Sequence, residues 1–330
     1  MNILIAGGTG SFGTAFIEHL QSIRYQGKVR VMSRDEAKQV GMESRYPHLK
    51  LETFIGDVRD PDAYSAAARD MDVVVHAAAL KHVPVGELFT EECIKTNTLG
   101  VSNLVKACQA NQVKKAIYLS TDKAVYPINA YGMAKALGEK IMTSKASREC
   151  DTIFCTTRYG NVIGSRGSIL PLLREKVRRN EKIPITDFSM TRFLMSLEQA
   201  VALVSYAIDK GTDGQMFIQK VEASDLRTLV EAYLQHYHQI SLDEYGYIDI
   251  GVRPGEKIHE VLASQEELAR ATFLSDENLI CVEAYHQKEL YRGTYDTPLP
   301  VSREHDFTSA SGTLLNLEQV KAILQTCLLE

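Results

Sequence analysis

The chain has 330 residues, of which 45% are hydrophobic and 24% charged, and its net charge is −5. This composition is ordinary for a soluble globular protein, and the length suffices for one large domain or two joined ones. The acidic balance argues against a nucleic-acid surface, and the longest apolar run, at 73–80, is far shorter than the ~20 residues of a membrane helix.

The first half of the chain alternates short apolar runs with longer helical patterns. The runs that predict strands lie at 2–6, 28–32, 51–56, 73–77, 115–120 and 152–158. The unbroken apolar run at 73–75 is typical of a parallel strand that is covered on both faces. Alternation with helices, the first at 14–23, predicts an α/β fold built on a doubly wound parallel Rossmann sheet.

After residue 167 the pattern becomes less regular, and the stretch 278–313 carries no pattern that assigns an element. The elements predicted beyond residue 167 are helices at 169–179 and 197–209 with a loop at Pro184 between them, a strand at 247–251, and helices at 256–262 and 317–328. These elements predict a smaller C-terminal unit beside the sheet.

The six cysteines are scattered along the chain without a CxxC pair. This spacing favours reduced thiols over a disulfide framework or a zinc site, so we expect no metal. The sequence opens directly on a strand pattern, which leaves no room for a signal peptide. We therefore expect a cytoplasmic protein.

A glycine-rich turn follows the first strand and opens the first helix. Its sequence, GGTGSFG at 7–13, has a GxxGxxG spacing. Glycines let a backbone approach phosphates closely, and the helix N-terminus supplies N–H donors and a positive dipole end. We expect this turn to hold the pyrophosphate of a nicotinamide dinucleotide. The expected contacts are Gly7, Thr9, Gly10, Ser11, Phe12 and Gly13.

The end of the second strand predicts which dinucleotide binds. An NAD site has an acid there to bind the adenosine ribose, whereas this chain has Ser33 and Arg34. An arginine pairs a 2′-phosphate in bidentate fashion, which favours NADP over NAD. In the alternative reading, Asp35 reaches the ribose and Arg34 is solvated. Further cofactor contacts are expected from Asp57 and Val58 beside adenine and from the small residues Ala77, Ala78 and Ala79.

Tyr131 and Lys135 are four residues apart in a predicted helix and therefore share one face. An ammonium near a phenol favours the phenolate and would pull the tyrosine pKa below its free value of ~10. A base of this kind is what an alcohol-to-ketone hydride transfer requires. The lysine can also hold the nicotinamide ribose.

Asp122 and Lys123 stand at the carboxyl end of the fifth strand, where ligands bind in open α/β sheets. An adjacent carboxyl and amine can serve as separate acid and base. The plainer alternative is an exposed charged turn.

Taken together, these residues resemble the extended short-chain dehydrogenase/reductases, and within them the soluble UDP-N-acetylglucosamine 4,6-dehydratases that invert carbon 5. The resemblance covers nearly the whole chain. It is carried by GGTGSFG at 7–13, SRDE at 33–36, HAAALKHVP at 76–84, KTN at 95–97, STDKA at 120–124, YGMAK at 131–135, RYGNV at 158–162, MTRF at 190–193 and RPGEK at 253–257.

The resemblance implies a role for each residue of the site. Tyr131 takes the proton of the carbon-4 hydroxyl, to which Thr121 also bonds, while hydride leaves for NADP. Neutral Lys123 then removes the carbon-5 proton, and protonated Asp122 assists loss of the carbon-6 hydroxyl as water. Retaining relatives have an Asp-Glu pair where this chain has Asp122 and Lys123, so the lysine indicates inversion.

The resemblance also implies binding residues, domains and assembly. Residues expected to bind a UDP-sugar are Lys81, Asn161, Arg192, Arg253 and Glu256, and the resemblance also implies that Lys81 contacts the cofactor. Residues 1–165, with 190–220 returning to them, would form the NADP-binding domain, and 166–189 with 221–330 the nucleotide-sugar-binding domain. The helices at 97–110 and 130–147 would form a dimer face in a homo-oligomer that can extend to a hexamer. Arg192 in a salt bridge between the domains is the plainer alternative.

Two other functions fit parts of the sequence. A UDP-hexose 4-epimerase also uses a tyrosine and a bound nicotinamide, but it needs neither Asp122 nor Lys123. A non-catalytic NADP-binding regulator would need neither Tyr131 nor Lys135. The presence of all four residues favours the dehydratase.

Overall fold

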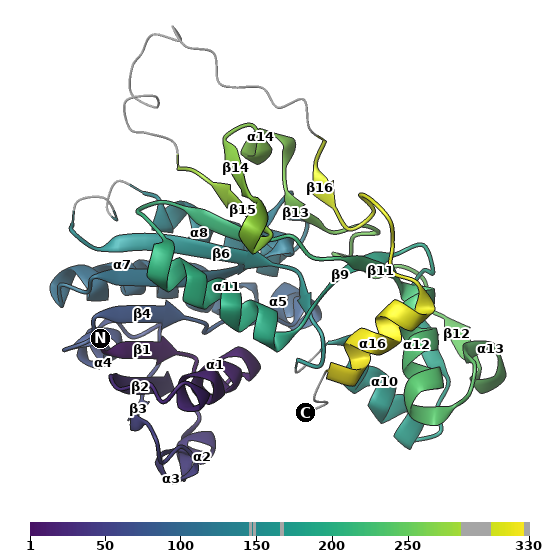
Figure 1. The fold of residues 1–330 in the computed structure, drawn as a ribbon, viewed down its shortest axis with the longest axis horizontal. Helices are drawn as coiled ribbons and strands as arrows, with labels where there is room; N and C mark the ends of the chain where they lie inside the picture. Colours follow the sequence, from purple (N-terminus) through teal and green to yellow (C-terminus); the bar gives the residue numbers. More distant parts are fainter. Residues whose placement is uncertain (145–146, 148–149, 166–167, 285–304, 327–330) are drawn as a thin grey trace, which may run out of the picture.

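The computed structural model describes residues 1–144, 147, 150–165, 168–284 and 305–326 (Figure 1). Among these residues, nine strands form one twisted sheet in the spatial order β14-β15-β10-β6-β5-β4-β1-β2-β3. The strands from β3 to β10 run parallel, and β15 and β14 are antiparallel additions at the edge. Their bounds are β1 Ile3–Ala6, β2 Lys28–Ser33, β3 Lys50–Ile55, β4 Val73–His76, β5 Lys115–Thr121, β6 Ile153–Tyr159, β10 Met216–Gln219, β14 Ala271–Leu274 and β15 Leu279–Val282.

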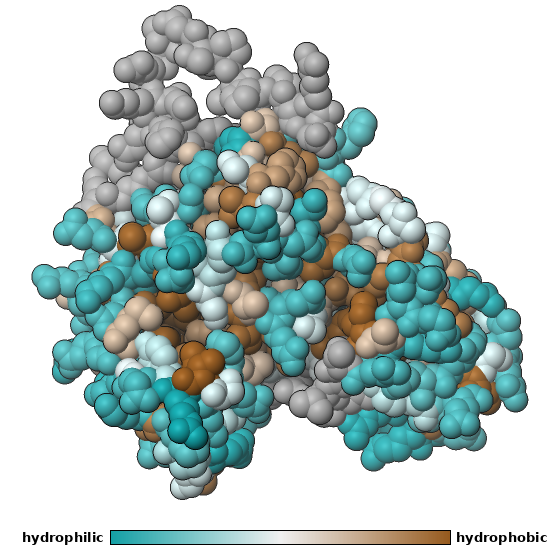
Figure 2. Space-filling model, in the orientation of Figure 1, coloured by the Kyte–Doolittle hydropathy of each residue, from teal (hydrophilic) through white to brown (hydrophobic). Residues whose placement is uncertain are grey.

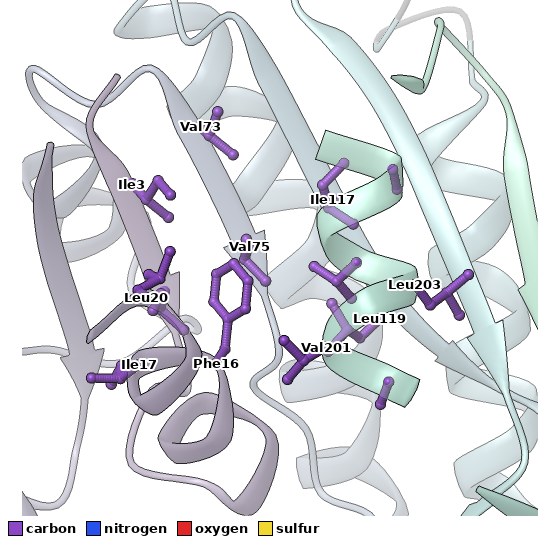
Figure 3. Packing of buried hydrophobic residues seen from close by; sticks show 14 of the residues in the cluster. Ile3, Phe16, Ile17, Leu20, Val73, Val75, Ile117, Leu119, Val201 and Leu203 are labelled. Atoms are coloured by element: carbon purple, nitrogen blue, oxygen red, sulfur yellow. The ribbon is translucent and has the colours of Figure 1, made fainter. Parts of the chain in front are cut away.

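The sheet is covered on both faces, as the unbroken apolar runs predict. Ile3 and Val75 point to one face, where α1 (Ser11–Ser22) and α11 (Leu197–Lys210) pack side by side (Figure 3). Their chain neighbours Leu4 and Val74 point to the opposite face, into a second apolar cluster with α4 (Pro61–Ala68) and α7 (Gly100–Ala110). The doubly wound Rossmann fold is therefore confirmed. From β1 the strand order runs outward through β2 to β3 on one side, and from β4 through β5 and β6 to β10 on the other. The topological switch point therefore lies between β1 and β4, and sheets of this kind bind ligands at the carboxyl ends of the strands at such a point.

A separate apolar core lies in the C-terminal part of the chain, away from the main sheet (Figure 1). It is built by α10 (Ile169–Arg178), α12 (Leu226–His238) and α16 (Leu317–Thr326). The small sheets beside it comprise β7 Asn161–Val162 with β9 Thr191–Met195 and β11 Ala223–Asp225, β8 Ile183–Ile185 with β12 Tyr247–Asp249, and β13 Val261–Ala263 with β16 Phe307–Thr308. On the face seen in Figure 2, hydrophilic residues cover most of the periphery and hydrophobic ones show towards the middle.

The remaining helical segments are short or lie over the ends of the strands. They are α2 Glu36–Gln39, α3 Met42–Arg45, α5 Val83–Leu88, α6 Thr90–Ile94, η1 Lys95–Leu99, η2 Asp122–Ala124, α8 Ala130–Met142, α13 Leu242–Tyr245, α14 Gln265–Leu268 and η3 Ser275–Glu277. In the part of the chain that the structure describes, no helix has the length and apolarity needed to cross a bilayer.

The predicted helix at 256–262 is wrong. The segment is irregular up to residue 260 and then continues as β13. Its backbone bonds to distant segments instead of to itself: Thr191 N donates to Ile258 O at 3.0 Å, and Ser309 N donates to Glu260 O at 2.8 Å. Tertiary pairing outweighs the local helical pattern here, and it places Glu260 beside the end of β5, as described below.

Two further predictions need correction. Pro184 lies in β8, paired with β12, and not in a loop; proline is tolerated in such short strand pairs because it can sit at an edge. The stretch 278–313, which has no sequence pattern, contains β15 and β16. Strands β14 and β15 join the main sheet although 271–282 fall in the predicted C-terminal domain.

A buried arginine joins the sheet, α8 and the C-terminal part. Arg158, at the end of β6, is 1% exposed. Its Nη2 donates to Glu139 Oε2 on α8 at 2.6 Å, and its Nη1 donates to Glu267 Oε2 on α14 at 2.8 Å and to Leu262 O at 3.0 Å. A guanidinium can satisfy two carboxylates at once because it presents five donors in a planar fork.

We predict that Glu267→Gln weakens the fold in a pH-dependent way. Arg158 lowers the pKa of Glu267 to about 2, against the opposing effect of burial. A lowered carboxyl pKa stabilises the folded state above the unfolded-state pKa, and this contribution is lost as the pH falls towards the folded value. At pH 7 the variant should lose on the order of 3 kcal/mol of unfolding free energy, measured by urea denaturation.

The difference between wild type and Glu267→Gln should shrink as the pH falls from about 4.5 towards 2. Glu266→Gln, at the exposed neighbouring position, is the matched control and should behave like the wild type. A stability gap that is constant between pH 7 and pH 2 would contradict the ion pair as its cause.

Candidate active site

The glycine-rich turn has no room for side chains. Gly7 adopts a φ of +85°, and a Cβ there would lie 2.7 Å from Ala78 N. A Cβ on Gly13 would lie 2.4 Å from Gly8 Cα. Gly10 caps α1, which begins at Ser11, so the first-turn N–H groups face the turn. This cradle fits a pyrophosphate, since backbone donors and a helix dipole meet where no side chain intervenes.

The end of β2 carries Arg34 and Asp35, the two side chains on which the choice of dinucleotide depends. Asp35 caps α2 by accepting from Lys38 N at 3.1 Å, and it also pairs with the Lys38 ammonium at 2.5 Å. The Arg34 side chain is 53% exposed and lies 3.6 Å from Asp57. Each of the two side chains therefore has an ion-pair partner on the protein.

The other predicted cofactor residues lie in the turn itself, at the end of β2, and after β3 and β4. Thr9 and Ser33 share a hydrogen bond of 2.7 Å, which ties the cradle to the end of β2. Val58 is buried, Ala77 and Ala78 are half-buried, and Ala79 and Lys81 are exposed in the segment that follows β4. Ala78 touches Gly7, so the segment after β4 lies against the cradle.

The predicted acid–base pair lies at the carboxyl end of β5 and is not an exposed turn. Asp122 is 0% exposed, and its Oδ1 accepts from Thr121 Oγ1 at 2.9 Å and from Lys123 Nζ at 3.0 Å. The Lys123 amine also lies 3.7 Å from Glu260 Oε1. Burial alone would lower the pKa of Lys123, but the two carboxyl groups beside it raise this pKa above its usual value.

Tyr131 joins this cluster from the start of α8. Asn129 caps α8 by accepting from Gly132 N at 2.7 Å. A Cβ on Gly132 would lie 2.1 Å from Lys123 O, so only glycine lets the helix approach η2 so closely. The Tyr131 phenol consequently lies near Lys123 and Asp122 and bonds with Thr121.

The expectation of a lowered tyrosine pKa is wrong for this structure. Burial raises the pKa of Tyr131 to about 12, although Lys123 and the bond with Thr121 act in the opposite direction. Lys135 turns away to the sheet, where its Nζ donates to Leu119 O at 2.5 Å and lies 4.0 Å from the centre of the Tyr118 ring. Burial lowers the pKa of Lys135 to about 7. Sharing a helix face therefore did not make Lys135 the charge partner of Tyr131.

Three of the predicted sugar-binding residues lie on two segments, one next to Asp122 and one next to the start of α8. Asn161 follows Gly160, whose Cβ position lies 3.5 Å from Asp122 Oδ2, and the buried Asn161 Oδ1 has no protein partner among the described residues. Arg253 and Glu256 pair with each other at 2.5 Å. Their loop is fixed to the start of α8 by Asn129 Nδ2, which donates to Gly255 O at 2.8 Å.

Arg192 adopts the bridging position that was the plainer alternative. Its Nη1 donates to Thr191 O at 2.7 Å and to Ile258 O at 3.1 Å, and its Nε lies 3.8 Å from Glu260 Oε1. The arginine thus connects β9 with the segment that precedes β13, at the edge of the acid–base cluster.

Sequence reasoning missed three residues of this site. Glu260 and Lys257 fall in the predicted helix at 256–262, which does not form, and the sequence analysis gives Gly132 no role of its own. Glu260 is 3% exposed and faces Lys123, whereas Lys257 Nζ donates to Val125 O at 2.5 Å. In the sequence, the signal for the close approach of α8 to η2 is the small size of Gly132, directly after Tyr131.

We predict that Arg34→Ala weakens binding of NADP at least about tenfold, since one charge-assisted contact contributes about 1.5 to 3 kcal/mol. Binding of NAD should hardly change, because NAD has no 2′-phosphate. Calorimetric titration of both dinucleotides provides the measurement. Arg24→Ala is the control: Arg24 is exposed beyond the far end of α1. An equal loss for both dinucleotides would refute the assignment of Arg34.

Comparison with known proteins places this site in a family. Residues 3–281 match the model of a family described as polysaccharide biosynthesis protein. A protein from Rickettsia bellii (strain OSU 85-389) named UDP-glucose 4-epimerase is 42% identical over 329 residues, which cover 98% of this chain and 94% of the relative.

Solved structures agree with this assignment. The X-ray structure of Pen from Bacillus thuringiensis is 31% identical, with a TM-score of 0.86 and coverage of 98% of this chain and 96% of Pen. The dTDP-glucose 4,6-dehydratase DesIV from Streptomyces venezuelae shares the fold, with a TM-score of 0.70, 18% identity and coverage of 78% and 87%. The chain belongs to the polysaccharide biosynthesis protein family, within the extended short-chain dehydrogenase/reductases.

Proposed function

We propose that this protein is a UDP-N-acetylglucosamine 4,6-dehydratase that inverts carbon 5 and uses bound NADP. The observation that carries the proposal is the cluster of buried Asp122 with half-buried Lys123 and Tyr131 at the carboxyl end of β5. It brings an acid, an amine and a phenol together beside the dinucleotide cradle. The proposed loss of water moves three protons: one from the carbon-4 hydroxyl, one from carbon 5 and one to the leaving carbon-6 hydroxyl. Each of the three groups transfers one of them.

NADP, when bound, supplies the acceptor and donor of hydride. Tyr131 takes the proton of the carbon-4 hydroxyl, which Thr121 orients. The carbon-4 ketone acidifies the neighbouring carbon-5 proton, which Lys123 removes as a neutral amine. Asp122 gives a proton to the carbon-6 hydroxyl, which leaves as water. Lys135, on α8, has its pKa lowered by burial and would hold the nicotinamide ribose.

Substrate contacts are assigned to residues that border this cluster. Asn161 has a buried oxygen to offer, and Arg253 and Glu256 lie in a loop fixed to the start of α8. Arginine suits a diphosphate because it binds in bidentate fashion, and a carboxylate suits a ribose hydroxyl. Lys81 and Arg192 complete the proposed set.

A UDP-hexose 4-epimerase is the second candidate because the 42% identical relative carries that kind of name. An epimerase returns hydride to carbon 4 and leaves carbons 5 and 6 unchanged. It would have no use for a buried amine that is flanked by two carboxyl groups. The two functions therefore differ in what happens at carbon 5.

We predict that the wild type, incubated with UDP-N-acetylglucosamine in deuterated water, forms a 4-keto-6-deoxy product with deuterium at carbon 5. Lys123→Met should lower this turnover by about 10²- to 10⁴-fold, as expected when a general base is lost. NADP binding should persist because the cradle is unchanged. Mass spectrometry and NMR of the sugar measure both the product and the label.

Lys114→Met is the matched control, since that lysine pairs with Asp72 and its side chain is 77% exposed. It should turn over like the wild type. Recovery of unlabelled UDP-N-acetylgalactosamine from the wild type would replace the dehydratase with the epimerase. Unchanged turnover in Lys123→Met would remove Lys123 as the base.

We also propose a homo-oligomer, with α8 in the contact face. Large apolar side chains are exposed on α5, α6, η1 and α8, which pack against one another. They are Val85, Leu88, Phe89, Ile94, Leu99, Met133 and Leu137. An exposed apolar area of this kind marks an interaction surface, and a second copy would cover it symmetrically.

We predict that Leu137→Arg reduces the particle mass in light scattering, because a charge would be buried in the contact. Ile248→Arg, at a similarly exposed apolar position on β12, should leave the mass unchanged. An oligomer that survives Leu137→Arg would exclude this face as the contact.

A further inference from the structure

Two carboxyl groups lie within 4 Å of the Lys123 amine, and they differ in how closely cations and donors approach them. Asp122 Oδ1 accepts hydrogen bonds from Thr121 and Lys123 at 2.9 and 3.0 Å. Glu260 Oε1 has its cations at 3.7 and 3.8 Å, beyond ordinary hydrogen-bond length. Glu260 Oε2 is buried and has no partner among the described residues.

The cations around Glu260 direct their hydrogen bonds elsewhere. The charged groups that face it are Asp122, Lys123, Arg192 and Lys257. Arg192 Nη1 donates to backbone carbonyls at 2.7 and 3.1 Å, and Lys257 Nζ donates to a third carbonyl at 2.5 Å. Hydrogen bonds to a carboxylate are what normally keep a buried one ionised. Glu260 lacks this support, and it also lies close to a second carboxyl group.

The backbone of Glu260 is nevertheless held firmly. Glu260 N donates to Ser309 Oγ at 2.9 Å, and Ser309 N donates to Glu260 O at 2.8 Å. Ser309 Oγ also bonds with Thr191 Oγ1 at 2.6 Å. A carboxyl group fixed this way and 3% exposed cannot relieve its charge by moving into water.

We propose that Glu260 acts as an uncharged carboxylic acid, a positioning residue that lies against Lys123 without locking the amine as an ammonium. The proposal deepens the proposed function. With Glu260 uncharged, the N–H bond of Lys123 breaks and an O–H bond forms on Asp122, which yields the neutral amine and the acid together. When Lys123 takes the carbon-5 proton and Asp122 gives its proton to the leaving hydroxyl, both groups return to their starting forms.

Ionised Glu260 would prevent this exchange. A second negative charge beside the amine stabilises the ammonium, and it acts strongly because the site is buried. The raised pKa of Glu260, caused by burial and by Asp122, keeps the carboxyl protonated to higher pH than a surface glutamate. Tyr131 also acts on the Lys123 amine, but it is not among the charged groups that face Glu260. Ionisation of Tyr131 therefore affects Lys123 more than it affects Glu260.

The decisive variant is Glu260→Gln, which is isosteric and never charged. We expect it to retain turnover near neutral pH and to shift the alkaline fall of kcat upward by about one pH unit or more. A role as proton donor or as charged ion-pair partner predicts loss of turnover instead. Glu222→Gln, at an exposed position away from the cluster, should show the wild-type profile.

Infrared titration tests the same point without turnover. The wild type should show a protonated carboxyl band near neutral pH that disappears on alkaline titration, and Glu260→Gln should lack it. Absence of this band from the wild type, or its persistence in Glu260→Gln, overturns the proposal. So does a variant with unchanged pH dependence or with turnover reduced 100-fold at every pH. Formation of no 4-keto-6-deoxy product by the wild type would refute the proposed function, and the infrared result would still decide the state of Glu260.

Discussion

One buried guanidinium holds the active-site helix, the sheet and the C-terminal part of the chain in register. Arg158 is paired with Glu139, one turn beyond Lys135 on α8, and with Glu267 on α14. Glu139 also accepts from Ser120 Oγ at 2.5 Å, at the end of β5. Because every donor and carboxylate in this group has a partner, the arrangement tolerates burial and has little freedom to shift.

The acid–base cluster depends on this register. Its members come from segments far apart in the sequence: Asp122 and Lys123 from η2, Tyr131 from α8 and Glu260 from the segment before β13. The close passage of α8 over η2 at Gly132 fixes the phenol. Glu260 is fixed by its backbone bonds with Ser309 and by the bond from Thr191 N to the nearby Ile258 O. Small displacements of either segment would separate groups that must exchange protons over about 3 Å.

Both burial and neighbouring charges set the pKa values of the groups in and around this cluster. The carboxyl neighbours of Lys123 raise its pKa. Burial lowers the pKa of Lys135 and raises the pKa of Tyr131. The shifts of Lys123 and Tyr131 both favour the protonated forms, so the structure holds an ammonium and a phenol side by side.

The sequence by itself determined the features that depend on local spacing. The GGTGSFG turn, the unbroken apolar runs and the strand–helix alternation are sufficient for the Rossmann sheet and the cradle, because these follow from period and from glycine geometry. Spacing also placed Asp122 and Lys123 at the end of a strand. Tertiary structure alone decided where Lys135 turns, that 256–262 is not a helix, and that Glu260 faces Lys123. Those outcomes rest on hydrogen bonds between residues tens to more than a hundred positions apart, which no local pattern encodes.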